Sequence, residues 1–530
     1  MVGKDLKFRS SYIYLCLVAW GVLLAGFFLY EEWAWTGSLN GVALDDSWIH
    51  FRFADNLRSG LGFSFNPGMS TPGSTSPLWV IVLSIFDHGY IIPAKLIGIL
   101  SYLGTGLVVY WLASSGGIKR SYAFLGAISA LAAGRLIWAA PSGMETTTFT
   151  LLTLVALWLW HRDAEKTISP VTSLVFGLAC LLRPEGYLLL VSSGVVWLVT
   201  SNASLKDREG WMDVARHFMI AGLMILPYLL FGFVTTGNLL PNTFYAKTSA
   251  WGCRPSPLYF GWIGPVFLLD NPILALMAAI GLGTLLRSRN WKDERLYTLC
   301  GLWLVGLPVL YGFMAPCISG YYTRYTTPLI PVMMILGAVG GQRLESTIPK
   351  WLAKLRNKTP SDTRPPLIAG LMVEGIILAM LPTILFWAPF YAQSVADIED
   401  MQMQIGHWLS QNSKQGDVLA LNDIGAIGYI ANREVIDLGG LISPQVLPLI
   451  RGKGPGEWDY PLADYLAAKR PDYLAIFPNW YPELAELVHA RPVYRVRLES
   501  RSIAGIPDLT IVGGGVMVVY RLDWTNVDKP

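Results

Sequence analysis

The sequence predicts a multi-pass α-helical membrane protein with a C-terminal extracytoplasmic α/β domain. Of its 530 residues, 53% are hydrophobic and only 15% are charged, whereas a soluble domain carries about 25% charge. Apolar runs of membrane-spanning length recur up to about residue 390, and charged, strand-like segments follow. We therefore expect a membrane domain over 1–390 and a soluble domain over 391–530.

The charge balance bears on the kind of partner. The net charge of +3 is too small to indicate nucleic acid as a partner. The 21 Trp and 24 Tyr residues suit a protein with long membrane–water interfaces, where amphipathic rings settle. The composition thus predicts the lipid bilayer as a partner and no nucleic acid.

The first apolar run begins near residue 11 and follows Lys4, Lys7 and Arg9. It is about 20 residues long, which is enough to span a bilayer, and no small-residue cleavage site follows it. We interpret it as a retained helix with its N-terminus in the cytoplasm rather than as a signal peptide. With this run, about eleven spans are expected by the length criterion; the others lie near 91–114, 121–140, 146–161, 168–182, 186–201, 216–234, 260–286, 297–315, 324–342 and 366–390.

The basic connections support this orientation in a plasma (inner) membrane, because cytoplasmic loops carry an excess of Lys and Arg. The cytoplasmic side then receives the basic connections 119–120, 162–166, 206–216, 287–295 and 343–364. The outer side receives 31–90, 141–146, 183–186, 237–247, 319–325 and everything after 390. Every chemically unusual stretch therefore lies on the outer side.

Two features of the outer side are less certain from the sequence. The segment 76–89 is apolar but short, and a full span there would reverse the orientation of the following loops. We expect a membrane-surface or re-entrant helix instead. Cys253 and Cys317 fall in predicted outer loops, so a disulfide between them is left open.

The segment after residue 391 reads as a helix followed by a strand. Further strands are expected within 433–438, 471–477, 493–498 and 515–522, and their alternation with helical stretches predicts a small α/β domain. The stretch NDIGAIGY (422–429) is rich in Gly but is neither a GxGxxG motif nor a P-loop. We therefore expect no nucleotide there.

The first outer loop contains DDSWIHFRFADNLRSGLG, starting at Asp45. This pattern predicts a short amphipathic helix that is ended by Gly60 or Gly62 and lies on the outer membrane surface. Asp45 and Asp46 begin it, and adjacent helical residues point about 100° apart. One aspartate can therefore cap the helix while the other faces a cavity, although a pure capping role for both is the alternative.

Other polar residues cluster on the same side of the predicted membrane. Ionisable groups at membrane depth are costly and usually functional. Snorkelling to the interface could explain each basic residue alone, but their common side favours a site. The candidates from the later outer loops are Glu145, Arg183, Glu185, Asn242, Tyr245, Lys247, Arg324 and Tyr325.

Carboxylates and several cations beside the bilayer suit the transfer of a sugar from a polyprenyl-phosphate donor. Arg and Lys bind the phosphate and stabilise its charge as it leaves. The acceptor hydroxyl needs a base, which a carboxylate provides in inverting glycosidases. The alternatives are a carrier or flippase that moves lipid-linked sugar without chemistry, which would need polar residues near the middle of the membrane, and a glycan-binding scaffold.

The segments DDSWIHFRFADNLRSGLGFSFNPG, SGMET, LLRPEG, GNLLPNTFYAK and YYTRYTTPLIP resemble, in this order, motifs of the GT-C membrane glycosyltransferases. In motif pattern the chain is most similar to the mycobacterial terminal arabinofuranosyltransferases, over most of residues 1–345. The resemblance implies about eleven helices and an active site on the outer face. It also implies transfer of an arabinofuranose- or mannose-like sugar from a polyprenyl phosphate to an extracytoplasmic glycan, lipid or protein.

The resemblance also implies roles for single residues. Asp45 would be the base, and Asp46 would orient the site or pair with Arg52. Glu145 would match an acidic residue of the second outer loop. Arg183, Lys247 and Arg324 would contact the donor, and the remaining donor-binding candidates are Arg52, Asn56, Glu185, Asn242, Tyr245 and Tyr325. Some GT-C branches use a divalent cation and others do not, so Mg, Mn or Ca stays open, with Asp45, Asp46, Glu145 and His50 as candidate ligands.

Overall fold

The structure is a computed structural model of the chain. It describes residues 10–163, 166–200, 208–249, 257–288, 294–314, 324–355, 365–454, 456–503, 505–507 and 509–525. Cys253 and Cys317, between which the sequence leaves a disulfide open, lie outside the described residues.

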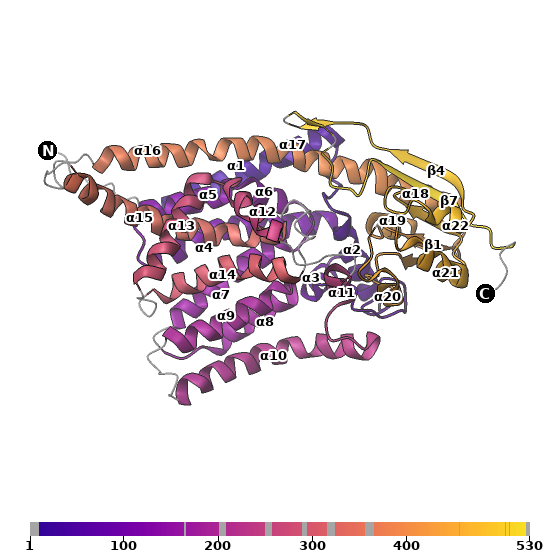
Figure 1. Ribbon diagram of the computed structural model, residues 1–530, viewed down its shortest axis with the longest axis horizontal. Coiled ribbons are helices and arrows are strands. Elements are labelled where there is room, and N and C mark those ends of the chain that lie inside the picture. The colour runs from indigo at the N-terminus through magenta and orange to yellow at the C-terminus, as the bar shows by residue number, and fades with distance from the viewer. Residues whose placement is uncertain are drawn as a thin grey trace.

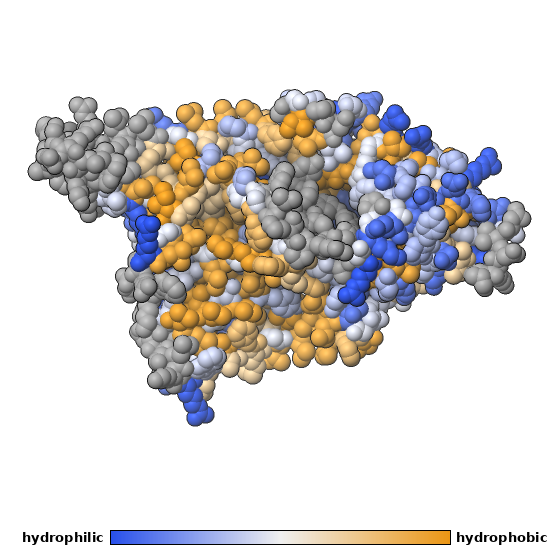
Figure 2. Space-filling model, viewed as in Figure 1, coloured by the Kyte–Doolittle hydropathy of each residue, from blue (hydrophilic) through white to orange (hydrophobic). Residues whose placement is uncertain are grey.

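A bundle of long helices makes up most of the molecule, and most of them run along its long axis (Figure 1). Its helices are α1 (Ser10–Thr36), α4 (Ile91–Ser115), α5 (Arg120–Ala132), α6 (Gly134–Ala139), α7 (Thr146–Arg162), α8 (Pro170–Leu182), α9 (Glu185–Thr200), α10 (Arg208–Thr236), α12 (Pro257–Leu268), α13 (Pro272–Ser288), α14 (Arg295–Met314), α15 (Ile330–Leu355), α16 (Pro365–Leu378) and α17 (Met380–Ile398). Each apolar run expected from the sequence contains at least one of them. Hydrophobic residues cover the visible side of the bundle, and hydrophilic residues gather over the C-terminal strands (Figure 2).

Within the described part of the chain, five helices are long and apolar enough to cross a membrane. They lie at Ser11–Thr36, Ile91–Ser115, Arg208–Thr236, Arg295–Met314 and Met372–Asn412. A further pair, Tyr259–Leu268 and Pro272–Arg287, passes the same test together but bends by 116° at its break. The lengths and hydropathies therefore agree with a multi-pass membrane protein, in which several helices are shorter than a usual span.

Short elements lie between the bundle and the C-terminal region, the part of the chain from residue 404 on (Figure 1). They are α2 (Asp45–Arg58), α3 (Pro77–Leu83) and α11 (Asn242–Ser249). The 3-10 helix η3 (Arg324–Leu329) directly precedes α15 and packs on bundle helices such as α7. At a rise of 1.5 Å per residue, α3 is about 10 Å long and cannot span a bilayer. This length agrees with the expectation of a surface or re-entrant helix at 76–89.

The expectation that α2 lies on the membrane surface is wrong. Nine of its 14 residues are buried, because the C-terminal region covers the face that the sequence pattern left for solvent. Trp48, for example, packs against Tyr429 of that region, with ring centroids 5.4 Å apart. The helix ends at Arg58, and Gly60 then takes a positive φ of 74°. A residue without a Cβ is favoured in that backbone conformation.

The C-terminal region is built on a mixed five-stranded sheet of order β2-β1-β3-β7-β4. Strand β1 is parallel to β2 and β3, and β7 is antiparallel to β3 and β4. The strands are β1 (Val418–Leu421), β2 (Glu434–Asp437), β3 (Tyr473–Ile476), β4 (Arg491–Arg497) and β7 (Val516–Arg521), with β5 (Ser502–Ile503) and β6 (Ile506–Pro507) in a separate pair. The helices are α18 (Gln404–Asn412), α19 (Gly425–Ala431), α20 (Leu447–Ile450), α21 (Asp459–Lys469) and α22 (Leu484–Leu487), with the short turn η6 (Pro444–Val446). The π-helical turn η5 (Glu399–Met403) directly precedes this region. The mixed α/β class predicted from the sequence is confirmed.

The domain boundary expected after residue 390 stays a prediction. That position lies inside α17, which continues through the π-helical turn η5 into α18 as one helical stretch, Met372–Asn412. One hydrophobic core includes Phe51 of α2 and Val395 of α17 together with Leu421 and Ile427 of the C-terminal region. A second core lies within that region, around Leu462, Leu474 and Leu484. The C-terminal region is therefore packed directly on the end of the bundle.

Candidate active site

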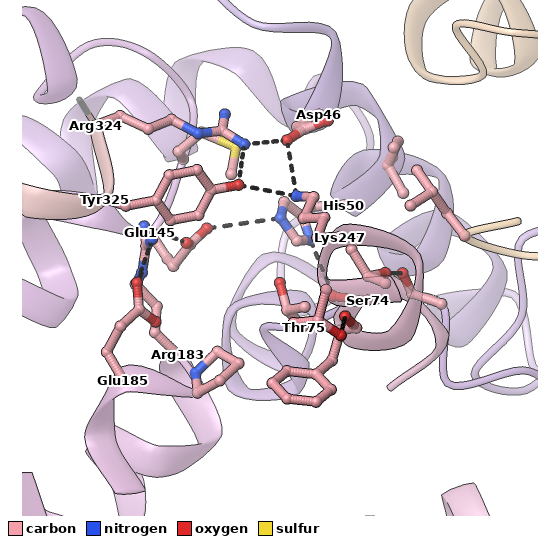
Figure 3. A pocket seen from close by; sticks show the side chains of 18 of the residues that line it. Asp46, His50, Ser74, Thr75, Glu145, Arg183, Glu185, Lys247, Arg324 and Tyr325 are labelled. Carbon is pink, nitrogen blue, oxygen red and sulfur yellow. Dashed lines mark hydrogen bonds and ion pairs between the residues drawn. The ribbon is translucent and has the colours of Figure 1, made fainter. Parts of the chain in front are cut away.

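A pocket opens where the bundle meets the short elements and the C-terminal region. Its empty space is about 980 Å³, a volume that includes open solvent. Ten of its polar residues are labelled in Figure 3, and they come from six separate stretches of the membrane part. These ten are Asp46, His50, Ser74, Thr75, Glu145, Arg183, Glu185, Lys247, Arg324 and Tyr325. The fold therefore gathers most of the outer-loop residues that the sequence singled out.

Asp46 forms ion pairs with two cations in this pocket. Arg324 donates a hydrogen bond to it, and Lys247 Nζ lies 3.7 Å from its Oδ2 (Figure 3). Lys247 and Arg324 also donate to the hydroxyl of Tyr325 at 3.0 and 3.1 Å. Burial would raise the pKa of Asp46, but Lys247 and Arg324 outweigh it and hold this pKa well below its ordinary value. Two cations thus share one carboxylate, which leaves this part of the pocket positively charged.

Arg183 forms the back wall of the pocket and is held by two carboxylates. It donates to Glu185 Oε1 at 3.0 and 2.6 Å and to Glu145 Oε1 at 3.1 Å. Its guanidinium lies 5.2 Å from the centre of the Tyr325 ring, a cation–π distance. Arg183 therefore orients Glu145 and Tyr325, and its charge is already balanced within the protein.

His50 links the pocket to the polar turn after α2. Its Nδ1 lies 3.1 Å from Ser74 Oγ, and its Nε2 lies 3.6 Å from Glu145 Oε2. Burial lowers the pKa of His50 and outweighs the opposing charges of Glu145 and Asp46, so the ring is neutral near pH 7. The sequence analysis treated His50 only as a candidate metal ligand and missed Ser74 and Thr75. The signal for these two was the polar turn STPGSTSP at 70–77.

Asp45 points away from this pocket. Both of its carboxylate oxygens accept backbone hydrogen bonds of 2.8 Å, from the N–H groups of Gly425 and Ala426 at the start of α19. Burial raises the pKa of Asp45 well above its ordinary value, and the charge of Asp423 raises it further. Of the two acidic neighbours, one thus caps a helix and the other faces the pocket, but the capped helix is α19 rather than α2.

Arg52 and Asn56, predicted to bind the donor, do not line the pocket. Arg52 donates to the carbonyl of Phe65 at 3.1 Å and to Asn432 Oδ1 at 2.6 Å, and Asn56 Nδ2 donates to the Phe65 carbonyl at 2.7 Å. The expected pair between Asp46 and Arg52 is therefore wrong. Residues six positions apart on an α-helix point about 120° apart, so Arg52 cannot enter the pocket that Asp46 faces.

Asn242 and Tyr245 also lie outside the pocket, on the helix that positions Lys247. Asn242 donates through its side chain to Thr71 Oγ1 at 3.1 Å and through its backbone to the carbonyl of Pro72. The ring of Tyr245 packs against Phe244 with centroids 5.6 Å apart. Asn242 thus fixes α11 against the polar turn, and this contact fixes where Lys247 enters the pocket.

A second cavity lies on the other side of Asp46, between α2, α11 and the C-terminal region. Its empty space is about 700 Å³ including open solvent. It shares Asp46, Ile49, Lys247 and Leu441 with the first pocket. Asp46 and Lys247 therefore stand where two cavities meet.

The donor set of the pocket does not fit a resident metal ion. Among the described residues, no three or more His, Cys, Asp or Glu side chains are grouped as metal ligands would be. Asp46 and Glu145 are paired instead with Arg324 and Arg183. We therefore derive no step through a metal.

Comparison with solved structures bears on the fold. The chain matches ArnT from Cupriavidus metallidurans, solved bound to undecaprenyl phosphate, with a TM-score of 0.59 and 13% identity over 97% of this chain and 98% of that one. It matches the Archaeoglobus fulgidus oligosaccharyltransferase, solved tethered to an acceptor peptide, with a TM-score of 0.60 and 12% identity over 93% of this chain and 73% of that one. The chain is a multi-pass membrane protein with a GT-C-like fold.

At these identities the likeness concerns the fold alone. The mycobacterial arabinofuranosyltransferase AftD matches with a TM-score of 0.46 and 15% identity over 95% of this chain and 41% of that one, which is too weak to carry an argument. Residues 394–517 match a family model described as a domain of unknown function (DUF8728). A search of curated protein sequences gives no match.

Proposed function

We propose that this protein is an inverting glycosyltransferase that takes a sugar from a polyprenyl-phosphate donor. The observation that carries the proposal is Asp46, a carboxylate between two cavities that is paired with Arg324 and Lys247. The GT-C-like fold supports it, because ArnT, which has this fold, was solved bound to undecaprenyl phosphate. An arabinofuranose- or mannose-like sugar remains our proposal for the group transferred.

The first pocket is the proposed donor site. A phosphate group entering it would attract Arg324 and Lys247 more strongly than the single carboxylate of Asp46 does, because phosphate carries more charge and offers more acceptor oxygens. Donor binding would then release Asp46 from its ion pairs and raise its pKa. Tyr325, held by the same two cations, would keep them in place during this exchange.

In the proposed reaction, a hydroxyl oxygen of the acceptor forms a bond to the anomeric carbon of the sugar. The bond from that carbon to the phosphate oxygen breaks, and its electron pair leaves with polyprenyl phosphate. The hydroxyl proton passes to Asp46. Arg324 and Lys247 stabilise the charge that develops on the leaving phosphate.

We assign the base to Asp46 rather than to Asp45. A base must reach the hydroxyl proton in the bound complex, and Asp46 borders both cavities. Both oxygens of Asp45 already accept backbone hydrogen bonds. Asp45 is therefore proposed as a positioning residue that holds the C-terminal region against α2.

The proposed site faces the extracytoplasmic side of the plasma (inner) membrane. This orientation rests on the basic connections of the sequence, such as 119–120, which are predicted to be cytoplasmic. The acceptor is then a molecule outside the cytoplasm.

The test is to incubate the purified full-length chain with a panel of polyprenyl-phosphate sugars, including arabinofuranose and mannose, and to measure donor consumption by mass spectrometry. We expect turnover of one donor, a decrease in kcat of about 100-fold or more in Asp46→Asn, and weaker donor binding in Arg324→Gln. Asp464→Asn and Arg495→Gln, on exposed parts of α21 and β4, are the matched controls. No turnover of any donor, or wild-type kcat in Asp46→Asn, would contradict the proposal and favour a carrier or another base.

A further inference from the structure

The second cavity has two kinds of wall. One is formed by α2 and α11 of the membrane part, and the other by loops of the C-terminal region. The residues that the C-terminal region contributes are Asn422, Asp423, Ile424, Leu438, Gly439, Leu441, Ile450, Trp458, Trp480 and Tyr481. The cavity therefore exists only where the two parts of the chain pack together.

The floor of the second cavity is aromatic and held in place. The rings of Trp458 and Tyr481 lie 5.7 Å apart, and Trp458 Nε1 donates to the carbonyl of Trp480 at 3.2 Å. The ring of Trp480 packs on Phe477, 5.7 Å away. The face of an aromatic ring carries a partial negative charge and attracts the weakly positive C–H groups on one face of a saturated ring. A sugar ring presents such a face.

The polar side of the cavity consists of hydrogen-bond acceptors at the end of β1. Asp423 accepts from Gln402 Nε2 at 2.9 Å, which fixes its carboxylate. Asn422 Oδ1 is buried and has no hydrogen-bond partner among the described residues. A buried acceptor without a partner costs free energy, and a ligand hydroxyl would satisfy it.

The charges of the second cavity select against an anion. Asp45, Asp46 and Asp423 line it, and Lys247 is the one basic residue among its lining residues. Burial, with Asp46 and Asp437 nearby, raises the pKa of Asp423 to about 6 despite its hydrogen bond from Gln402. Carboxylates outnumber cations among the lining residues of this cavity but not of the first pocket, so the second cavity disfavours a phosphorylated ligand.

We propose that the second cavity binds the acceptor, and that this acceptor is a neutral sugar unit. Its ring would lie against Trp480 and Tyr481, and its hydroxyls would donate to Asn422 and Asp423. A further hydroxyl would then face Asp46 at the junction of the two cavities. The proposal rests on the glycosyltransferase function for the transfer step, whereas the binding of a sugar can be tested on its own.

The test measures ligand binding without donor, by saturation-transfer NMR and calorimetry on the full-length chain in nanodiscs. The probes are neutral methyl furanosides and pyranosides, their 6-phosphates, and a Ser/Thr-containing peptide. We expect one neutral glycoside to bind and its affinity to fall about tenfold or more in Asp423→Asn, which loses a hydrogen bond to a charged group, and to fall also in Trp480→Leu, which loses the aromatic face. Asp464→Asn and Trp408→Leu are the controls, because Trp408 stacks on Tyr494 away from the cavity.

The opposite results overturn the proposal. They are no binding of any neutral glycoside, tighter binding of the 6-phosphates, binding of the peptide instead, or unchanged affinity in both cavity variants that remain folded. The binding result is separate from donor turnover. Donor turnover without glycoside binding would refute the acceptor site and leave the transferase function intact. Asp423-dependent glycoside binding without donor turnover would support the sugar site and refute the transferase function.

Discussion

At the scale of single residues, Asp45 and Asp46 show how two adjacent, identical side chains acquire different properties. Asp45 caps α19 of the C-terminal region through two backbone hydrogen bonds. Asp46 is paired with Arg324 and Lys247 in the pocket. Their pKa values move in opposite directions, because burial dominates for Asp45 and the two cations dominate for Asp46.

The two aspartates should therefore respond differently to the same substitution. Asp46→Asn should abolish turnover and also lower stability, because it leaves Arg324 and Lys247 without their carboxylate partner. Asp45→Asn replaces a carboxylate oxygen that accepts a backbone N–H by an amide group that donates, which should destabilise the docking of α19 by roughly 1–3 kcal/mol. Thermal unfolding and donor turnover of both variants test this. If Asp45→Asn is instead stable but inactive, the catalytic base is Asp45 and not Asp46.

Stability should also depend on pH through the carboxylates of the C-terminal region. Burial raises the pKa of both Asp423 and Asp437 to about 6, above the ordinary value of 3.8. The folded state therefore binds more protons than the unfolded state between about pH 6 and pH 4, and stability should increase as the pH falls through that range.

Thermal unfolding from pH 7 to pH 5 tests this sign, and Asp423→Asn should reduce the dependence. Asp46, whose pKa is lowered, stabilises the fold above its unfolded pKa and loses this effect only at lower pH. A melting temperature that falls steadily from pH 7 to pH 5 would contradict the prediction.

At the scale of elements, the GAIG stretch in NDIGAIGY explains how α19 docks on α2. A Cβ at Gly425 would lie 2.0 Å from the backbone carbonyl oxygen of Asp45, and a Cβ at Gly428 would lie 2.9 Å from the ring of Phe65. These glycines allow close helix packing.

Gly425→Ala should therefore separate α19 from α2. The clash is with backbone atoms, which cannot rotate away, so we expect a loss of about 1–3 kcal/mol or more, as in overpacked cores. Gly416→Ala is the control, because nothing lies within 4 Å of its Cβ position. Thermal unfolding compares the two variants. Equal melting temperatures would show that the α2–α19 contact is looser than described.

At the scale of the whole molecule, the C-terminal region forms part of the candidate site. The core runs from α2 into the C-terminal region without a break, and α17 continues into α18. The second cavity has walls from both parts. A boundary after residue 390 therefore cuts through one packed unit.

A chain that ends after residue 416 should accordingly fail as a separate membrane domain. Its α2 would expose Trp48 and Phe51, which are now buried, and Asp45 would lose its partners. We expect aggregation on size-exclusion chromatography in detergent and no donor turnover. Full-length protein treated in the same way is the control. A monodisperse and active truncated chain would show that the membrane part folds and works alone.

The sequence by itself determined the class of this protein, because lack of charge and runs of apolar residues are local properties that the bilayer selects. It also indicated most of the ten pocket residues labelled in Figure 3, since costly polar groups between apolar runs stand out in the sequence. Lys247, Arg324 and Asp46 were found in this way. The choice between Asp45 and Asp46, by contrast, depends on which neighbour each one meets, and these neighbours lie hundreds of positions away in the chain.

Tertiary structure alone decided the burial of α2, the places of Arg52 and Asn56, and the existence of the second cavity. The burial of α2, the place of Arg52 and the second cavity each depend on contacts between the α2 segment and the C-terminal region, as in the hydrogen bond from Arg52 to Asn432, whereas Asn56 is held by carbonyls of its own loop. A helix pattern shows which residues share a face, but not what will cover that face. The covering segment is chosen by packing of the whole chain, and here it changes a surface helix into the centre of a two-sided site.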